Sequence, residues 1–124
     1  MNMTATDSAA EAVLLREEKQ GVVTLTLNRG AQYNGLSEEM LNALQQELGQ
    51  IAGDDSVRCV VLAANGKAFC AGHDLKQMRA NPEKAYYQKL FTQCGQMMQQ
   101  IVNLPVPVIA RVNGIATAAG CQLV

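Results

Sequence analysis

The sequence predicts an α/β fold in which strands and helices alternate within one domain. Two apolar runs, at 22–28 and 58–64, have the length and the flanking turn residues of strands. Between them, apolar residues recur at helical spacing at Leu41, Leu44 and Leu48. The chain has 124 residues, of which 48% are hydrophobic, so it can bury a core. Strands that alternate with helices are typical of the α/β class.

The first elements are two strands followed by a helix. We expect a strand over 13–18, joined to the run that begins at Val22 by a turn at Gln20-Gly21. Ser37 is placed to cap the helix, because its hydroxyl can accept from a free amide of the first turn. Two glutamates follow it at the positive end of the helix dipole, and Gly53 ends the helix.

The middle of the chain contains a strand and a short helix. The run at 58–64 is mostly apolar, which is typical of a strand buried on both faces. Residues 65–67 read Asn-Gly-Lys and turn the chain. Asp74 is placed to cap a short helix that extends through Arg79.

The last part predicts a long helix, a strand and the start of another helix. Pro82 begins the long helix, and Pro105 and Pro107 end it. A strand follows over 108–112, and a further helix begins near Ala118. The expected order is ββαβααβα. The chain ends a few residues into its last helix without a stop signal, so we expect a truncated domain.

Composition argues against several classes of protein. The net charge is −1, the pI is about 5.7 and no Lys/Arg cluster stands out, so we expect no nucleic-acid partner. No apolar run could cross a bilayer, so we expect no membrane contact. The four cysteines form no CxxC pair and His73 is the only histidine, so we expect no zinc site. Residues 1–11 lack the features of a secretory signal, and we expect a disordered tail there and a cytoplasmic protein with reduced thiols.

Two segments rich in small residues, 67–75 and 113–121, could carry chemistry. Each follows an expected strand and leads into an expected helix. Small side chains let a ligand approach the main chain, and a helix N-terminus has unpaired N–H groups suited to an anion. Either segment taken alone is better explained by tight packing of a helix on a strand. Neither is a GxGxxG or Walker motif, so dinucleotide and P-loop sites are not indicated.

Together the two segments resemble motifs of the enoyl-CoA hydratase/isomerase (crotonase) family. FCAGHDL at 69–75 resembles the family's F-x-A-G-x-D-[LI], and VNGIATAAGC at 112–121 resembles its V-N-G-x-A-x-G-G-G-C. The resemblance covers nearly the whole chain, from about Val13 onward. Other matching segments are Leu27-Asn28-Arg29, Asn34-Gly-Leu-Ser37 and Pro105-Val-Pro-Val-Ile-Ala110.

This resemblance implies a ClpP-like crotonase spiral of ββα units, with 12–124 as its N-terminal part. It also implies an oxyanion hole made by the backbone N–H groups of Ala71 and Ala119. A thioester carbonyl gains negative charge as its α-carbon becomes enolate-like, and preorganised N–H groups stabilise that charge. The implied reaction is hydration of a 2-enoyl-CoA or a related isomerisation in fatty acid metabolism. CoA would be the substrate's carrier, with no metal or other cofactor.

The family's hydratases have a glutamate where this chain has Gln122. An amide can orient water but cannot take its proton at neutral pH, so two-carboxylate hydration is in doubt. An acyl-CoA-binding or regulatory protein without hydratase activity is therefore the alternative, and an inactive fragment is a third reading.

The resemblance also implies contacts with substrate around the two segments and a homotrimer or dimer of trimers. His73 is interpreted first as a structural or CoA-flanking side chain and Asp74 first as a helix cap. Cys70 and Cys121 have no base partner in the sequence, so packing is their expected role. The expected substrate-binding residues are Ala68, Gly72, His73, Asp74, Leu75 and Gly120.

Overall fold

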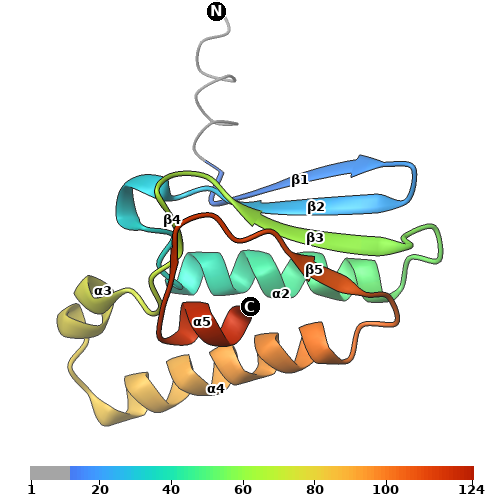
Figure 1. Ribbon diagram of the computed structural model, residues 1–124. Coiled ribbons are helices and arrows are strands. Elements are labelled where there is room, and N and C mark those ends of the chain that lie inside the picture. Colours follow the sequence, from blue (N-terminus) through green and yellow to red (C-terminus); the bar gives the residue numbers. More distant parts are fainter. Residues whose placement is uncertain (1–11) are drawn as a thin grey trace, which may run out of the picture.

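The computed structural model describes residues 12–124, and Figure 1 shows the arrangement of its elements. The disordered tail expected at 1–11 lies outside the described residues. The predicted α/β class is confirmed. The elements in chain order are β1 (Leu14–Lys19), β2 (Val22–Leu27), η1 (Gly30–Gln32), α2 (Glu38–Ala52), β3 (Cys59–Ala64), β4 (Ala68–Cys70), α3 (Leu75–Ala80), α4 (Lys84–Val102), β5 (Val108–Ala110), β6 (Ile115–Ala116) and α5 (Ala119–Leu123).

A four-stranded sheet in the order β1-β2-β3-β5 forms one layer of the described chain. β1 is antiparallel to β2, while β3 is parallel to both β2 and β5. The β1–β2 turn has positive φ at Gln20 (54°) and Gly21 (83°), the backbone of a type I′ hairpin turn. The parallel strands need long crossovers, and these contain α2 and α4.

The helices α2, α4 and α5 all lie on the same side of the sheet in Figure 1. α2 begins as predicted, because the Ser37 Oγ accepts a hydrogen bond from the Met40 N–H at 3.1 Å. Its apolar face is buried against the sheet and α4. The buried residues of α2 are Met40, Leu41, Leu44, Leu48 and Ile51.

The core ends at a partly exposed face of α4 and at the open face of the sheet. In α4, Leu90, Cys94 and Met97 are buried, but Phe91 is 48% exposed. β3 alternates buried with half-buried residues, so the expectation of a strand covered on both faces is wrong for the described chain. The helices cover one face of the sheet, and the opposite face stays partly accessible.

Two very short strands, β4 and β6, have no counterpart in the expected order ββαβααβα. They pair in parallel, with Ala68 opposite Ile115 and Cys70 opposite Ala116. Strands of three and two residues are too short to show a period-two pattern, which is why the sequence did not predict them. Their pairing brings the segments that follow β3 and β5 into direct contact.

Two element boundaries differ from those expected from the sequence. The strand expected over 108–112 ends at Ala110, and the helix expected from Pro82 begins at Lys84. Cys59, Cys70, Cys94 and Cys121 are all free thiols. Within residues 12–124, no helix is long and apolar enough to span a bilayer.

Candidate functional site

The two small-residue segments meet at the β4–β6 pair, where glycines allow unusually close backbone contact. A Cβ at Gly120 would overlap the carbonyl oxygen of Cys70, and a Cβ at Gly114 would overlap that of Lys67. The Thr117 N–H donates to the Cys70 carbonyl at 3.1 Å. Tight packing of the backbone therefore explains the absence of a side chain at Gly114 and Gly120.

Gly72 forms the contact between the first segment and the start of α5. Its φ of +97° lies in a region that side chains rarely adopt. A Cβ at Gly72 would lie 3.1 Å from the Ala118 Cβ and 3.5 Å from the Ala119 amide nitrogen. The predicted donor Ala119 thus lies directly beside the loop that carries the other predicted site residues.

Ala119 is the first residue of α5, where amides have no partner within the helix. The following amides are engaged, because the Gly120 N–H donates to Thr117 O at 2.8 Å and the Gln122 N–H to Ala118 O at 3.2 Å. Among the described residues, no hydrogen-bond acceptor is found for the Ala119 N–H. This amide is available to a ligand.

The assignment of Ala71 as the other donor needs correction. Its N–H donates to the Tyr33 carbonyl at 3.0 Å, so this amide already has a partner. A group engaged within the fold cannot also stabilise a substrate oxyanion without breaking that bond.

His73 supplies a better donor on the same loop. Leu36 and His73 form an isolated parallel bridge in which the Leu36 N–H donates to the Gly72 carbonyl at 2.7 Å. The Gly72 carbonyl and the His73 N–H belong to the same trans peptide, so they point in opposite directions. The His73 N–H therefore faces away from Leu36, and no acceptor for it is found in the described part of the chain.

The His73 side chain packs against α4. Its ring centroid lies 5.1 Å from that of Phe91, and its Nδ1 is buried without a hydrogen-bond partner in the described chain. Burial lowers the pKa of His73 below 6.5, and the Leu36 backbone carbonyl partly opposes this shift. The imidazole is therefore neutral at pH 7.

The remaining predicted site residues divide into buried, structural and exposed positions. Ala68 is buried, and Gly120 is packed on Cys70. Asp74 is a helix cap as interpreted, because its Oδ1 accepts from the Gln77 N–H at 3.1 Å. Leu75 is 66% exposed, and Gln122 is also exposed, close to the donor Ala119 in sequence.

The two cysteines nearest the donor amides differ in exposure. Burial raises the pKa of the Cys70 thiol, although the Gly72 N–H opposes this shift, so the thiol stays protonated at neutral pH. Cys121 is exposed. The expected packing role fits Cys70.

Asn34 holds the site loops together, although the sequence alone predicts no role for it. Its side chain is fully buried, its φ is +53°, and it bonds to Arg29, Asn65 and Ala68. The available signal was Asn34 followed by Gly35 in a loop between a strand and a helix, a pair that favours left-handed backbone.

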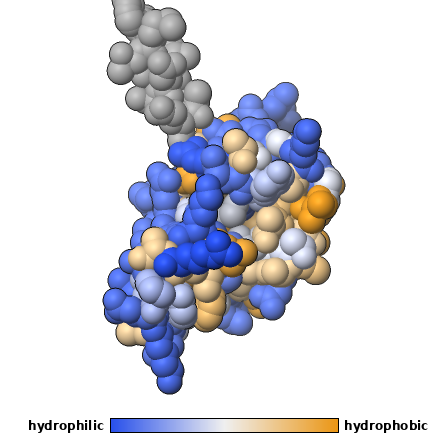
Figure 2. Space-filling model, turned by 90° about the vertical axis from the view of Figure 1, so that its left-hand side faces the viewer, coloured by the Kyte–Doolittle hydropathy of each residue, from blue (hydrophilic) through white to orange (hydrophobic). Residues whose placement is uncertain are grey.

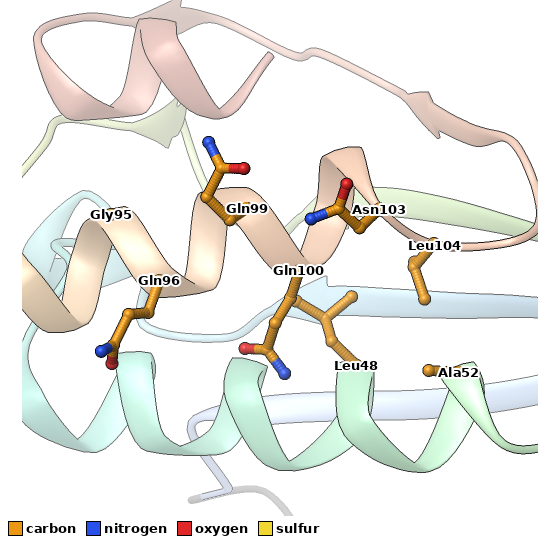
Figure 3. A pocket seen from close by; sticks show the side chains of 8 residues that line it. All are labelled: Leu48, Ala52, Gly95, Gln96, Gln99, Gln100, Asn103 and Leu104. Carbon is orange, nitrogen blue, oxygen red and sulfur yellow. The ribbon is translucent and has the colours of Figure 1, made fainter.

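A groove of about 610 Å³ lies elsewhere, between α2 and α4 (Figure 3). Leu48 and Leu104 line it, and the side chains of Gln96 and Gln100 point from α4 toward α2. Gln99, also among the lining residues, points to the opposite side of α4. None of its lining residues belongs to the loops that carry His73 and Ala119. The groove is therefore separate from the candidate oxyanion site.

Other surface features do not define a site of their own. Figure 2 shows apolar residues, in orange and tan, mixed with hydrophilic ones on the face at the left of Figure 1. Within residues 12–124, no group of three His, Cys, Asp or Glu side chains is placed to hold a metal ion.

Comparison with known proteins places this geometry in a family. The enoyl-CoA hydratase/isomerase family model matches residues 17–124. Enoyl-CoA hydratase domain-containing protein 3 from Xenopus laevis is 42% identical over 108 residues, which are 87% of this chain and 37% of the relative. The segments GHDL (72–75) and ATAAGCQLV (116–124) of this chain also resemble this member of the family. The 1,2-epoxyphenylacetyl-CoA isomerase of Escherichia coli is 35% identical over 120 residues, covering 89% of this chain and 43% of the relative.

Solved structures agree with the expected spiral. An enoyl-CoA hydratase from Mycobacterium smegmatis superposes with a TM-score of 0.89 at 63% identity, covering 91% of this chain and 44% of that one. Human enoyl-CoA hydratase domain-containing protein 3 gives 0.85 at 37% identity, covering 90% and 44%. This chain therefore spans less than half the length of these relatives.

The predicted cytoplasmic location is wrong by this comparison, because the relatives from Xenopus laevis and human are named mitochondrial proteins. The match over 17–124 and the shared crotonase fold show that the chain belongs to the enoyl-CoA hydratase/isomerase family.

Proposed function

We propose that the protein binds an acyl-CoA thioester and stabilises its enolate with the backbone N–H groups of His73 and Ala119. The observation that carries this proposal is the pair of amides without acceptors on two loops that touch at Gly72. Negative charge on the thioester oxygen grows as the α-carbon loses a proton or gains a nucleophile. Two fixed donors bind that developing anion more tightly than the neutral carbonyl, which lowers the barrier.

The reaction is hydration or isomerisation of an enoyl-CoA, and Gln122 bears on the choice. A hydratase needs a carboxylate to take the proton of the attacking water, and the amide of Gln122 cannot do so. An isomerisation moves a proton between carbon atoms without activated water, but it also needs a base to carry that proton, and Gln122 cannot be that base. The relative named as an isomerase of 1,2-epoxyphenylacetyl-CoA is consistent with that chemistry.

A non-catalytic acyl-CoA-binding protein is the second candidate, and the observation that favours it is again Gln122. The oxyanion amides would then bind the thioester carbonyl without a general base beside it. CoA as substrate carrier and the absence of a metal requirement remain predictions in both readings.

Self-association into trimers or dimers of trimers also belongs to the proposal. Ile109 on β5 and Ile115 on β6 are 54% and 65% exposed, and apolar surface of this kind is typical of covered interfaces. Light scattering after size-exclusion chromatography measures the mass, and a monomer across the micromolar range would contradict this part.

The test of catalysis is Ala119→Pro, assayed for turnover of crotonyl-CoA. Proline removes the donor N–H and is accepted at the first position of a helix. Ala118 before it is not extended (φ 52°, ψ −128°), so a thermal melt first checks that the variant folds. Loss of one oxyanion donor lowers kcat by roughly 10²–10³-fold, so we expect a loss of that size. Lys84→Pro is the matched control, since Lys84 is the first residue of α4 and Glu83 before it is extended (φ −125°, ψ 138°).

The outcomes separate the two candidates. Turnover that survives in Lys84→Pro and is lost in Ala119→Pro supports catalysis through the hole. Binding of crotonyl-CoA by the parent chain, with neither hydration of crotonyl-CoA nor isomerisation of 3-butenoyl-CoA, supports the binding protein. Turnover that is equal in all three proteins contradicts a donor role for Ala119.

A further inference from the structure

We infer that Asn34 is a positioning residue, which aims the His73 N–H by fastening the 29–36 loop to the turn and strand at 65–70. The inference rests on the proposed oxyanion role of His73. Asn34 is the one polar side chain in the buried set of the described chain. Asn side chains are mostly exposed to solvent, so a buried one that bridges two loops of a candidate site indicates a specific structural role.

Three of the four hydrogen-bonding positions of the Asn34 amide have a partner in the two loops. Its Oδ1 accepts from the Arg29 N–H at 2.7 Å. Its Nδ2 donates to the Asn65 carbonyl at 2.8 Å and to the Ala68 carbonyl at 3.0 Å. One side chain therefore closes its own loop and also holds both ends of the 65–68 turn.

The fastened loop in turn holds the segment that precedes His73. Tyr33, before Asn34, accepts the Ala71 N–H at 3.0 Å, and Leu36, two residues after it, donates to the Gly72 carbonyl at 2.7 Å. The Tyr33 bond holds the peptide between Cys70 and Ala71, and the Leu36 bond holds the Gly72–His73 peptide, which carries the His73 N–H. The orientation of the His73 amide is thus set from the 29–36 loop.

Asparagine suits this position for two independent reasons. Its φ of +53° is left-handed backbone, which Asn adopts more readily than other residues with a side chain except Asp. Its amide also offers two donors and an acceptor, which the three partners require. Asp has the same shape and a similar backbone preference. However, it places an acceptor oxygen, instead of the NH₂ donor, next to the two carbonyl oxygens.

The test is the carbonyl stretching frequency of butyryl-CoA labelled with ¹³C at the thioester carbonyl, bound to the full chain. Donors in an oxyanion hole polarise this carbonyl and lower its frequency relative to free butyryl-CoA. For Asn34→Asp we expect less than half of the parent's frequency lowering. The Kd for butyryl-CoA is expected to change by less than about threefold, because the CoA portion supplies most of the binding.

Asn65→Asp is the matched control. It makes the same chemical change on the same turn, but Asn65 is exposed and its side chain bonds outward to the Asn28 Oδ1 at 2.9 Å. We expect this variant to keep the parent's frequency lowering. A reduction equal to that of Asn34→Asp would overturn the inference.

The remaining outcomes are also decisive. If the parent binds butyryl-CoA without lowering its carbonyl frequency, the proposed oxyanion function fails and the inference fails with it. If the parent lowers the frequency and Asn34→Asp lowers it equally, the inference alone fails. Should Asn34→Asp not fold in a thermal melt, Asn34→Gly, which keeps the left-handed backbone, replaces it. Unfolding of both variants assigns Asn34 to the fold alone and overturns the positioning role.

Discussion

Ala118 stands at the entrance to α5 with a backbone that suits glycine. Its φ is 52° and its ψ is −128°, a left-handed combination that places a Cβ in steric conflict. The family motif that this segment resembles has glycine here, which adopts positive φ without this strain. The strained residue also sets the direction of the Ala119 N–H that follows it.

Ala118→Gly is expected to raise the free energy of unfolding by about 1 kcal/mol, because it removes the cost of positive φ. Urea denaturation measures this change. Ala43→Gly in the middle of α2 is the comparison, and it is expected to lower stability by about 0.5–1 kcal/mol. A loss of stability in Ala118→Gly would contradict the strain argument.

His73 is the only histidine, so its titration can be followed without overlap. Its folded pKa is lowered below 6.5 by burial, so the unfolded chain takes up the proton first as pH falls. Stability is therefore highest above the unfolded pKa and declines as pH falls through the folded one. Urea denaturation between pH 7.5 and the folded pKa is expected to show this decline in the parent and a smaller one in His73→Gln. Equal declines would show that other groups cause it.

At the scale of elements, the contact between β4 and α5 depends on the absence of a side chain at Gly120. Gly120→Ala would force the Cys70 carbonyl and the first turn of α5 apart, with an expected cost of about 1–3 kcal/mol. Gly95→Ala in α4 is the control, because a Cβ there meets nothing within 4 Å. It is expected to stabilise by about 0.5–1 kcal/mol. Thermal melts compare the two, and a neutral Gly120→Ala would mean that this contact is loose.

At the scale of the whole molecule, one cluster of buried side chains joins the sheet to α2, α4 and α5. We therefore expect a single cooperative unfolding transition, seen at the same midpoint by circular dichroism and tyrosine fluorescence. Leu44→Ala, at a fully buried position of α2, is expected to cost about 2–5 kcal/mol. Val102→Ala, at a position 73% exposed, is expected to change stability by less than about 0.5 kcal/mol. Separate transitions for the two probes would contradict a single core.

The sequence alone determined the elements whose signals are local. These elements depend on residues only a few positions apart, so a short stretch of sequence predicts them. They are the Gln20-Gly21 turn, the Ser37 and Asp74 caps and the apolar face of α2. Family membership was likewise predicted from two short motifs in order, and the family match over 17–124 confirms it.

Only the tertiary structure decided which amides are free to act. Ala71 and His73 lie two residues apart in one motif, and nothing in the sequence tells which N–H the fold uses. The Ala71 amide is bonded to Tyr33, a residue 38 positions away, while the His73 amide faces away from Leu36. Backbone N–H groups are chemically alike in every residue except proline, so their availability depends on long-range contacts rather than on residue type.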